Sequence, residues 1–366
     1  MFKEKLWCSS LRTTLFNFTL KEEVTTLNYV SYLVYVIALF SATYYFDITL
    51  VFLLRHPDYY NLSESEATRT VGNLVFYRSI VRIIIDPLCG SIHDVVPRKT
   101  FLIVFIILLV PIYILMPICR GIYPDLLLLM LFIGILLSNL YTTPILSNLV
   151  AKKSLGISMA ITCLCIDLAR VVSVYVFLKL NQVISIGWAM TTVGIFLCTI
   201  ALFLIFGLKH IPVTGKYQNV FKQMFNALKY IKSQPIFCFY FAYNTISYAF
   251  TYLSGTYFTI FVASSFGNSE EQIQEAQALT ASIKGIGNIV NAVVSGTFGF
   301  VADNITGYLG LTIACAIMAI GGIGFVVITS CNGYGIYISY ILLIIGLQGS
   351  RIMVFISLHI GWKAIV

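Results

Sequence analysis

Charged side chains recur within stretches of this chain that are otherwise apolar. Five of them are cations, namely Arg78, Arg82, Arg170, Lys284 and Arg351, and three are acids, namely Asp47, Asp86 and Asp167. A cation in apolar surroundings attracts anions, and a desolvated carboxylate can exchange a proton near neutral pH. The elements that carry these side chains therefore determine whether they bind a ligand, exchange protons or neutralise one another.

The composition places those elements in a membrane. Of the 366 residues, 59% are hydrophobic and only 10% are charged. Soluble globular proteins have roughly 25% charged residues, so this chain has too few to cover a surface that faces water. About 20 apolar residues cross about 30 Å of hydrocarbon as a helix. The predicted spans are 27–54, 69–93, 100–118, 123–149, 157–178, 184–207, 236–264, 276–302, 308–329 and 336–360.

Positive charge is distributed unevenly between the segments that connect the spans. Most of the Lys and Arg residues in these segments fall on one side, which the positive-inside rule makes cytosolic. That side contains the N-terminal tail (1–26) and a basic linker (208–235). The linker pattern predicts an amphipathic helix on the membrane surface, with a solvated linker as the alternative. Since topology explains the formal charge of +8, we expect lipid and a small solute as partners and no nucleic acid.

Some of the charges within spans can neutralise one another on a single helix. Arg82 and Asp86 are four residues apart, and Asp167 and Arg170 are three apart, so each pair shares a helix face. Arg78 lies one turn from Arg82 and is repelled by it, which leaves Asp47 as the available acid for Arg78. The proton-coupling or counterion candidates are Asp47, Asp86 and Asp167.

The four spans after the linker contain Lys284 and Arg351 but no acid. Charges at this depth must pair or face a polar site, which favours an organic or inorganic anion as ligand. The predicted binding residues are Arg78, Lys284, Arg351, Asn244, Tyr248 and Asn288. One alternative is an acid beyond residue 366 that pairs with Lys284 or Arg351. Another is a neutral sugar or polyol, bound by the Tyr and Asn side chains and coupled to protons through Asp47.

A short motif occurs twice along the chain. Residues 90–94 read GSIHD at the cytoplasmic end of the second span, and residues 299–303 read GFVAD at the end of the eighth. Such a parallel repeat predicts an N-terminal bundle of six helices over 27–207 and a C-terminal bundle of four over 236–366. An equal second half would extend beyond Val366, so two helices are either truncated or absent.

The stretch GSIHDVVPRK resembles the loop signature of the major facilitator superfamily, although Val95 and Pro97 depart from the family pattern. The resemblance implies an all-α membrane protein with two pseudo-symmetric six-helix bundles, of which about ten helices are present here. It also implies secondary active or facilitative transport of a small solute by alternating access. The gating-loop residues carried over from the family are Gly90, Asp94, Arg98, Lys99, Gly299 and Asp303.

Enzymatic chemistry is not expected. The sequence has no Walker loop and no cluster of metal ligands, and its four histidines are dispersed. We therefore expect no catalytic residue, no metal and no cofactor. The prediction is a monomeric, multi-pass protein of the plasma membrane or an organelle membrane, with a cytosolic N-terminus, which binds a small molecule with or without a co-transported ion. A non-transporting membrane scaffold or receptor is the remaining alternative.

Overall fold

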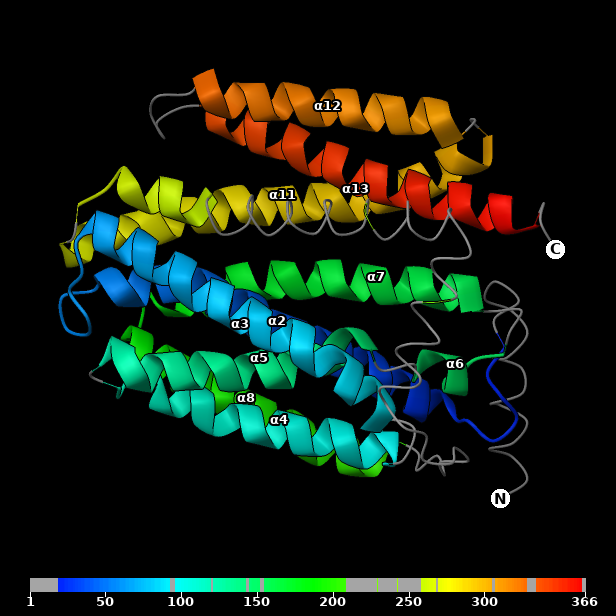
Figure 1. The fold of residues 1–366 in the computed structure, drawn as a ribbon, viewed down its shortest axis with the longest axis horizontal. Coiled ribbons are helices and arrows are strands. Elements are labelled where there is room, and N and C mark those ends of the chain that lie inside the picture. Colours follow the sequence, from blue (N-terminus) through cyan, green and yellow to red (C-terminus); the bar gives the residue numbers. More distant parts are fainter. Residues whose placement is uncertain are drawn as a thin grey trace. The chain divides into compact units, whose positions relative to one another are not determined.

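The computed structural model describes residues 19–92, 96–119, 121–142, 145–151, 155–208, 258–267, 269–304, 307–327 and 334–363, with residues 229 and 242. The named helical elements (Figure 1) are α2 (Thr26–Arg55), α3 (Glu64–Ile92), α4 (Arg98–Leu115), η1 (Ile122–Leu126), α5 (Leu127–Thr142), α6 (Leu146–Leu149), α7 (Leu155–Val172), η3 (Ser173–Leu178), α8 (Ile186–Gly207), α11 (Glu270–Asn304), α12 (Gly307–Val327) and α13 (Tyr334–Lys363). Residues 258–264 are also helical.

These helices coincide closely with the predicted spans, so the prediction of an all-helical chain is confirmed. Within the described residues, α2, α4 and α8 are long and apolar enough to cross a membrane. Most of the predicted span 236–264 lies outside the described residues. The same holds for most of the predicted tail (1–26) and for the basic linker (208–235).

The described residues belong to two compact units. The first comprises Met1–Ala42, Asn73–Ala169 and Met190–Val220, and the second comprises Thr43–Gly72, Arg170–Ala189 and Phe221–Val366. Each unit therefore consists of segments that are distant from one another in the sequence. The two bundles expected at 27–207 and 236–366 stay a prediction.

In the first unit, a polar cap connects the start of α2 to the end of α8. Thr25 donates its backbone N–H and its hydroxyl to Asn28 Oδ1 at 3.0 and 2.9 Å. Asn28 Nδ2 in turn donates to the carbonyl of Gly207 at 2.7 Å. The Thr25 and Asn28 side chains satisfy donors that a helix N-terminus leaves open, while Asn28 also satisfies an acceptor at a helix C-terminus.

This cap gives a testable prediction. We expect Asn28→Ala to cost about 1–3 kcal/mol of stability, because it removes the cap and leaves the buried Gly207 carbonyl without its donor. Thermal unfolding of the purified protein measures the effect as a lower melting temperature. Ser65→Ala is the control, since Ser65 is exposed in the first turn of α3. Equal melting temperatures for the two variants would contradict the assignment.

In the second unit, the buried end of α2 is attached to the segment that precedes α11. The Arg55 side chain is only 4% exposed. Its guanidinium donates to the carbonyls of Ala263, of Phe266 at 2.7 Å and of Gly267 at 3.3 Å. These acceptors lie at and just beyond the end of the 258–264 helix, where carbonyls lack helical partners and a cation is favourable.

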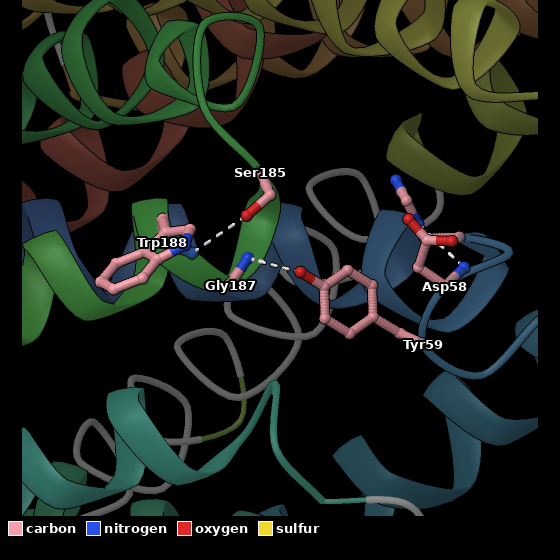
Figure 2. Close-up of polar contacts among 6 residues, drawn as sticks. Asp58, Tyr59, Ser185, Gly187 and Trp188 are labelled. Carbon is pink, nitrogen blue, oxygen red and sulfur yellow. Dashed lines mark hydrogen bonds and ion pairs between the residues drawn. The ribbon is translucent and has the colours of Figure 1, made fainter.

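The loop after α2 is attached to the start of α8 (Figure 2). Tyr59 Oη accepts a hydrogen bond from the backbone N–H of Gly187 at 2.9 Å, and Ser185 Oγ accepts one from Trp188 at 3.5 Å. Both bonds satisfy N–H groups in the first turn of α8, which have no acceptor within the helix. The loop therefore positions the C-terminal end of α2, on which Arg55 lies.

The core of the second unit contains residues from 258–264, α11 and α13. Phe258, Val262, Ile283, Ile336 and Tyr340 form its buried cluster. In Figure 1, α13 lies beside both α11 and α12. Helices α12 and α13 approach closely at positions where glycine has no side chain. A Cβ on Gly346 would lie 2.5 Å from the Cα of Met318, and one on Gly321 would lie 2.9 Å from the Cα of Leu343.

Candidate functional site

A lysine on α11 is one of the charged side chains buried within the second unit. Lys284 is 6% exposed, and its ammonium donates to Thr259 Oγ1 at 2.5 Å. The same ammonium lies 5.9 Å from the centroid of the Phe258 ring. A cation over an aromatic face is attracted by the negative face of the ring. Two consecutive residues of the 258–264 helix therefore supply a hydroxyl and a ring to this cation.

Asp47 on α2 provides the opposite charge. Its carboxylate acts electrostatically on the Lys284 ammonium, and Asp47 itself is half-buried. Burying an ammonium costs several kcal/mol unless a counter-charge or hydrogen bonds compensate. The hydroxyl of Thr259, the ring of Phe258 and the carboxylate of Asp47 together compensate that cost.

A second cation approaches the same cluster from α7. The guanidinium carbon of Arg170 lies 4.8 Å from the centroid of the Tyr44 ring, and Arg170 acts electrostatically on Tyr340. The Tyr340 and Phe258 rings are 4.3 Å apart. Lys284 lies near the Phe258 ring and Arg170 acts on the Tyr340 ring, and these two rings are in contact. Tyr44 is one helical turn from Asp47 on α2. We call Tyr44, Asp47, Arg170, Phe258, Thr259, Lys284 and Tyr340 the Lys284 cluster.

Two glycines on α11 allow neighbouring rings to reach this cluster. A Cβ on Gly285 would lie 2.5 Å from the hydroxyl oxygen of Tyr175, and one on Gly287 would lie 2.7 Å from Cε1 of Tyr340. Tyr175 belongs to η3, a wide helical turn in which the Ser173 hydroxyl bonds the carbonyl of Arg170 at 2.8 Å. The small residues beside Lys284 thus set how closely α11 packs against α13 and η3.

Of the other predicted binding residues, the structure describes the side chains of Arg78 and Asn288. Arg78 lies in the first unit, 5% exposed, where a Cβ on Gly134 of α5 would come within 2.9 Å of the Arg78 carbonyl oxygen. Asn288 is half-buried on α11, one turn from Lys284. The backbone of Arg351 lies in α13, while its side chain is outside the described residues, as are Asn244 and Tyr248 entirely.

The predicted acids and loop residues also have different surroundings. Asp86 pairs with Arg82 at 3.7 Å, which confirms the expected ion pair within one helix. Asp167 is buried at 1% exposure.

Among the predicted loop residues, Lys99 donates to the carbonyl of Ile205 in α8 at 2.6 Å. Asp94 lies outside the described residues. The remaining loop candidates are Gly90 at the end of α3, Arg98 at the start of α4, and Gly299 and Asp303 near the end of α11.

Sequence reasoning missed part of the cluster. It treated Arg170 as a partner of Asp167 and did not place Tyr44, Phe258, Thr259 or Tyr340 in a site. The spacing of Tyr44 and Asp47, three residues apart on one face of α2, is the signal that could have indicated the first of these. The other three are ordinary apolar or small polar residues that only tertiary packing brings to Lys284.

The helical architecture and the buried ion cluster define a multi-pass membrane protein with a polar site in its interior. The family model described as Major Facilitator Superfamily matches residues 24–360, and the chain belongs to that family. The resemblance drawn from GSIHDVVPRK is therefore confirmed, and the protein is a membrane-embedded transporter of small solutes. The sequence matches no curated protein.

Several solved structures share the fold. One is a bacterial homologue of the human lysosomal transporter Spinster in an inward-facing, unoccupied conformation, with 15% identity, a TM-score of 0.58, and coverage of 91% of this chain and 75% of that one. Another is a D-xylose–proton symporter, with 14% identity, a TM-score of 0.57, and coverage of 90% and 80%. At such identities the likeness establishes the fold alone.

Proposed function

We propose that the protein is a secondary transporter that moves a small organic or inorganic anion by alternating access, with Lys284 as the residue that binds the negative charge. The observation that carries this proposal is the burial of an ammonium beside a hydroxyl, an aromatic ring and the carboxylate of Asp47. An anion that enters the cluster replaces Asp47 as the counter-charge of Lys284. Arg170 supplies a second positive charge to the same ligand.

The proposal predicts a large loss of transport in Lys284→Met. A hydrogen bond to a charged group contributes about 1.5–3 kcal/mol, which corresponds to roughly 10- to 150-fold in affinity. We expect uptake of labelled anions into proteoliposomes to fall by at least about tenfold, while Lys284→Arg retains part of it. Lys179→Met is the matched control, because Lys179 lies in the same unit but is exposed over the Tyr175 ring.

Unchanged uptake of every anion by Lys284→Met, at equal protein level in the vesicles, would refute the anion proposal. A melting temperature within a few degrees of the wild type is required for both lysine variants. This requirement separates loss of the binding charge from loss of the fold.

A proton-coupled sugar or polyol transporter is the second candidate. The solved D-xylose–proton symporter shares the fold, and Asp47 offers a carboxylate for the proton beside a hydroxyl-bearing cluster. This candidate predicts uptake of a neutral sugar that depends on pH between about 5 and 8 in the wild type and not in Asp47→Asn. The anion proposal predicts no uptake of a neutral sugar at any pH.

A further inference from the structure

The Lys284 cluster continues along α11 as a row of buried polar side chains. Gln277 and Thr280 lie seven and four residues before Lys284, so all three occupy one face of the helix. Gln277 is 1% exposed and Thr280 is 0% exposed. A helix rises about 1.5 Å per residue, which places these two residues about 10 and 6 Å from Lys284 along the axis.

Both side chains have unused hydrogen-bonding capacity. Among the described residues, Gln277 Oε1 and Thr280 Oγ1 are buried atoms with no hydrogen-bond partner. Buried polar atoms are nearly always paired, since an unpaired one retains the full cost of losing water. Two such atoms on the face that also carries Lys284 indicate a group that is present only when the site is filled.

The chemistry of that group follows from the two side chains. Gln277 Oε1 is an acceptor, and the Thr280 hydroxyl both donates and accepts. Hydroxyl groups of a ligand satisfy both, whereas an alkyl chain satisfies neither. Lys284, at the end of the row, binds the negatively charged group of the ligand.

We propose that the site takes a hydroxylated organic anion, with its carboxylate or phosphate at Lys284 and its hydroxyl groups at Thr280 and Gln277. This inference rests on the proposed function, because it needs Lys284 as the anion-binding residue. It adds a specificity subsite that discriminates between anions of equal charge and length. A site built to hydrogen-bond a hydroxyl strongly rejects the analogue that lacks it, since its own polar groups are then left unpaired.

The test measures binding of two matched pairs of probes to the purified full chain by calorimetry. The pairs are gluconate with hexanoate, and glycerol 3-phosphate with propyl phosphate. We expect the hydroxylated member of at least one pair to bind about tenfold more tightly than its partner. In Thr280→Val and in Gln277→Met, both close in shape to the native residue, that preference falls to about threefold or less.

Two controls accompany these variants. Thr280→Ser retains the hydroxyl and keeps the preference, which shows that the effect of valine is not a packing effect. Ser282→Ala changes an exposed hydroxyl on another face of α11 and leaves all four affinities unchanged. Melting temperatures of the free proteins identify any variant that fails to fold. If Gln277→Met fails, the comparison of Thr280→Val with Thr280→Ser decides, and if Thr280→Val fails, Gln277→Met decides.

The outcomes distinguish this inference from the proposed function. If the wild type binds both members of each pair equally and Lys284→Met weakens all four, the anion site stands and the hydroxyl subsite is wrong. If Lys284→Met leaves binding unchanged while Thr280→Val weakens it, the anion proposal is wrong. Binding of none of the four probes overturns the inference, as does a preference that persists in both Thr280→Val and Gln277→Met.

Discussion

Replacing Gly346 with leucine is expected to prevent α12 and α13 from packing, and with them the second unit. A Cβ at this position would lie 2.5 Å from both Cα and Cβ of Met318 and would also overlap its backbone nitrogen. Backbone atoms in a helix cannot move aside as a flexible side chain does. The cost therefore exceeds the 1–3 kcal/mol typical of overpacked cores, reaching about 3 kcal/mol or more. The yield of monodisperse protein in size-exclusion chromatography measures the effect.

The same pair of helices offers a matched control. On α12, a Cβ on Gly322 would meet no atom within 4 Å, whereas one on the preceding Gly321 would overlap the backbone of Leu343. We expect Gly322→Leu to fold normally and Gly321→Leu to fail as Gly346→Leu does. Monodisperse yields that are equal for the three variants would show that α12 and α13 do not approach as closely as described.

Arg55→Met is expected to produce the second large effect, on stability. The substitution leaves the carbonyls of Ala263, Phe266 and Gly267 without the donor that now bonds all three. Hydrogen bonds to a charged group contribute about 1.5–3 kcal/mol each. Allowing for solvent that reaches the freed carbonyls, we expect a loss of about 3 kcal/mol or more, read as a lower melting temperature.

Two further variants make this prediction specific. Arg55→Lys keeps the charge, but a compact ammonium cannot reproduce the planar fork of donors, so we expect it to recover only part of the stability. Arg69→Met removes an exposed arginine of α3 and is expected to change stability by less than about 0.5 kcal/mol. If Arg55→Met and Arg69→Met melt at the same temperature, the contact does not stabilise the unit.

The helices were predictable because their signal is local. A run of about 20 apolar residues is stable in lipid as an α-helix. The ends of α2 and α13 therefore fall within a few residues of those predicted at 27–54 and 336–360. The Arg82–Asp86 pair was predictable for the same reason, since one helix contains both partners. Lys284 was identified because a charge within an apolar span is conspicuous in the sequence.

The partners of Lys284 were not predictable in this way. Contacts with Thr259, Phe258 and Asp47 depend on which helices are neighbours, and the apolar pattern of a span does not encode that. Asp47 illustrates the difficulty: sequence reasoning assigned it to Arg78 and gave no reason to place it near Lys284, on whose ammonium its charge acts. The unpaired atoms of Gln277 and Thr280 could not be predicted from the sequence either, because the folded core determines which buried atoms have a hydrogen-bond partner.

The acceptors of Arg55 are all main-chain oxygens, and this determines what kinds of change the contact withstands. A backbone carbonyl remains whatever side chain is attached, so substitutions at positions 263, 266 and 267 can alter packing without deleting an acceptor. A carbonyl also takes up no proton across the physiological pH range, unlike the carboxylate of an ordinary ion pair. A substitution at position 55 therefore removes this contact between α2 and the end of the 258–264 helix, whereas a substitution at an acceptor position leaves the acceptor oxygen in place, and none of the three acceptors is lost by protonation.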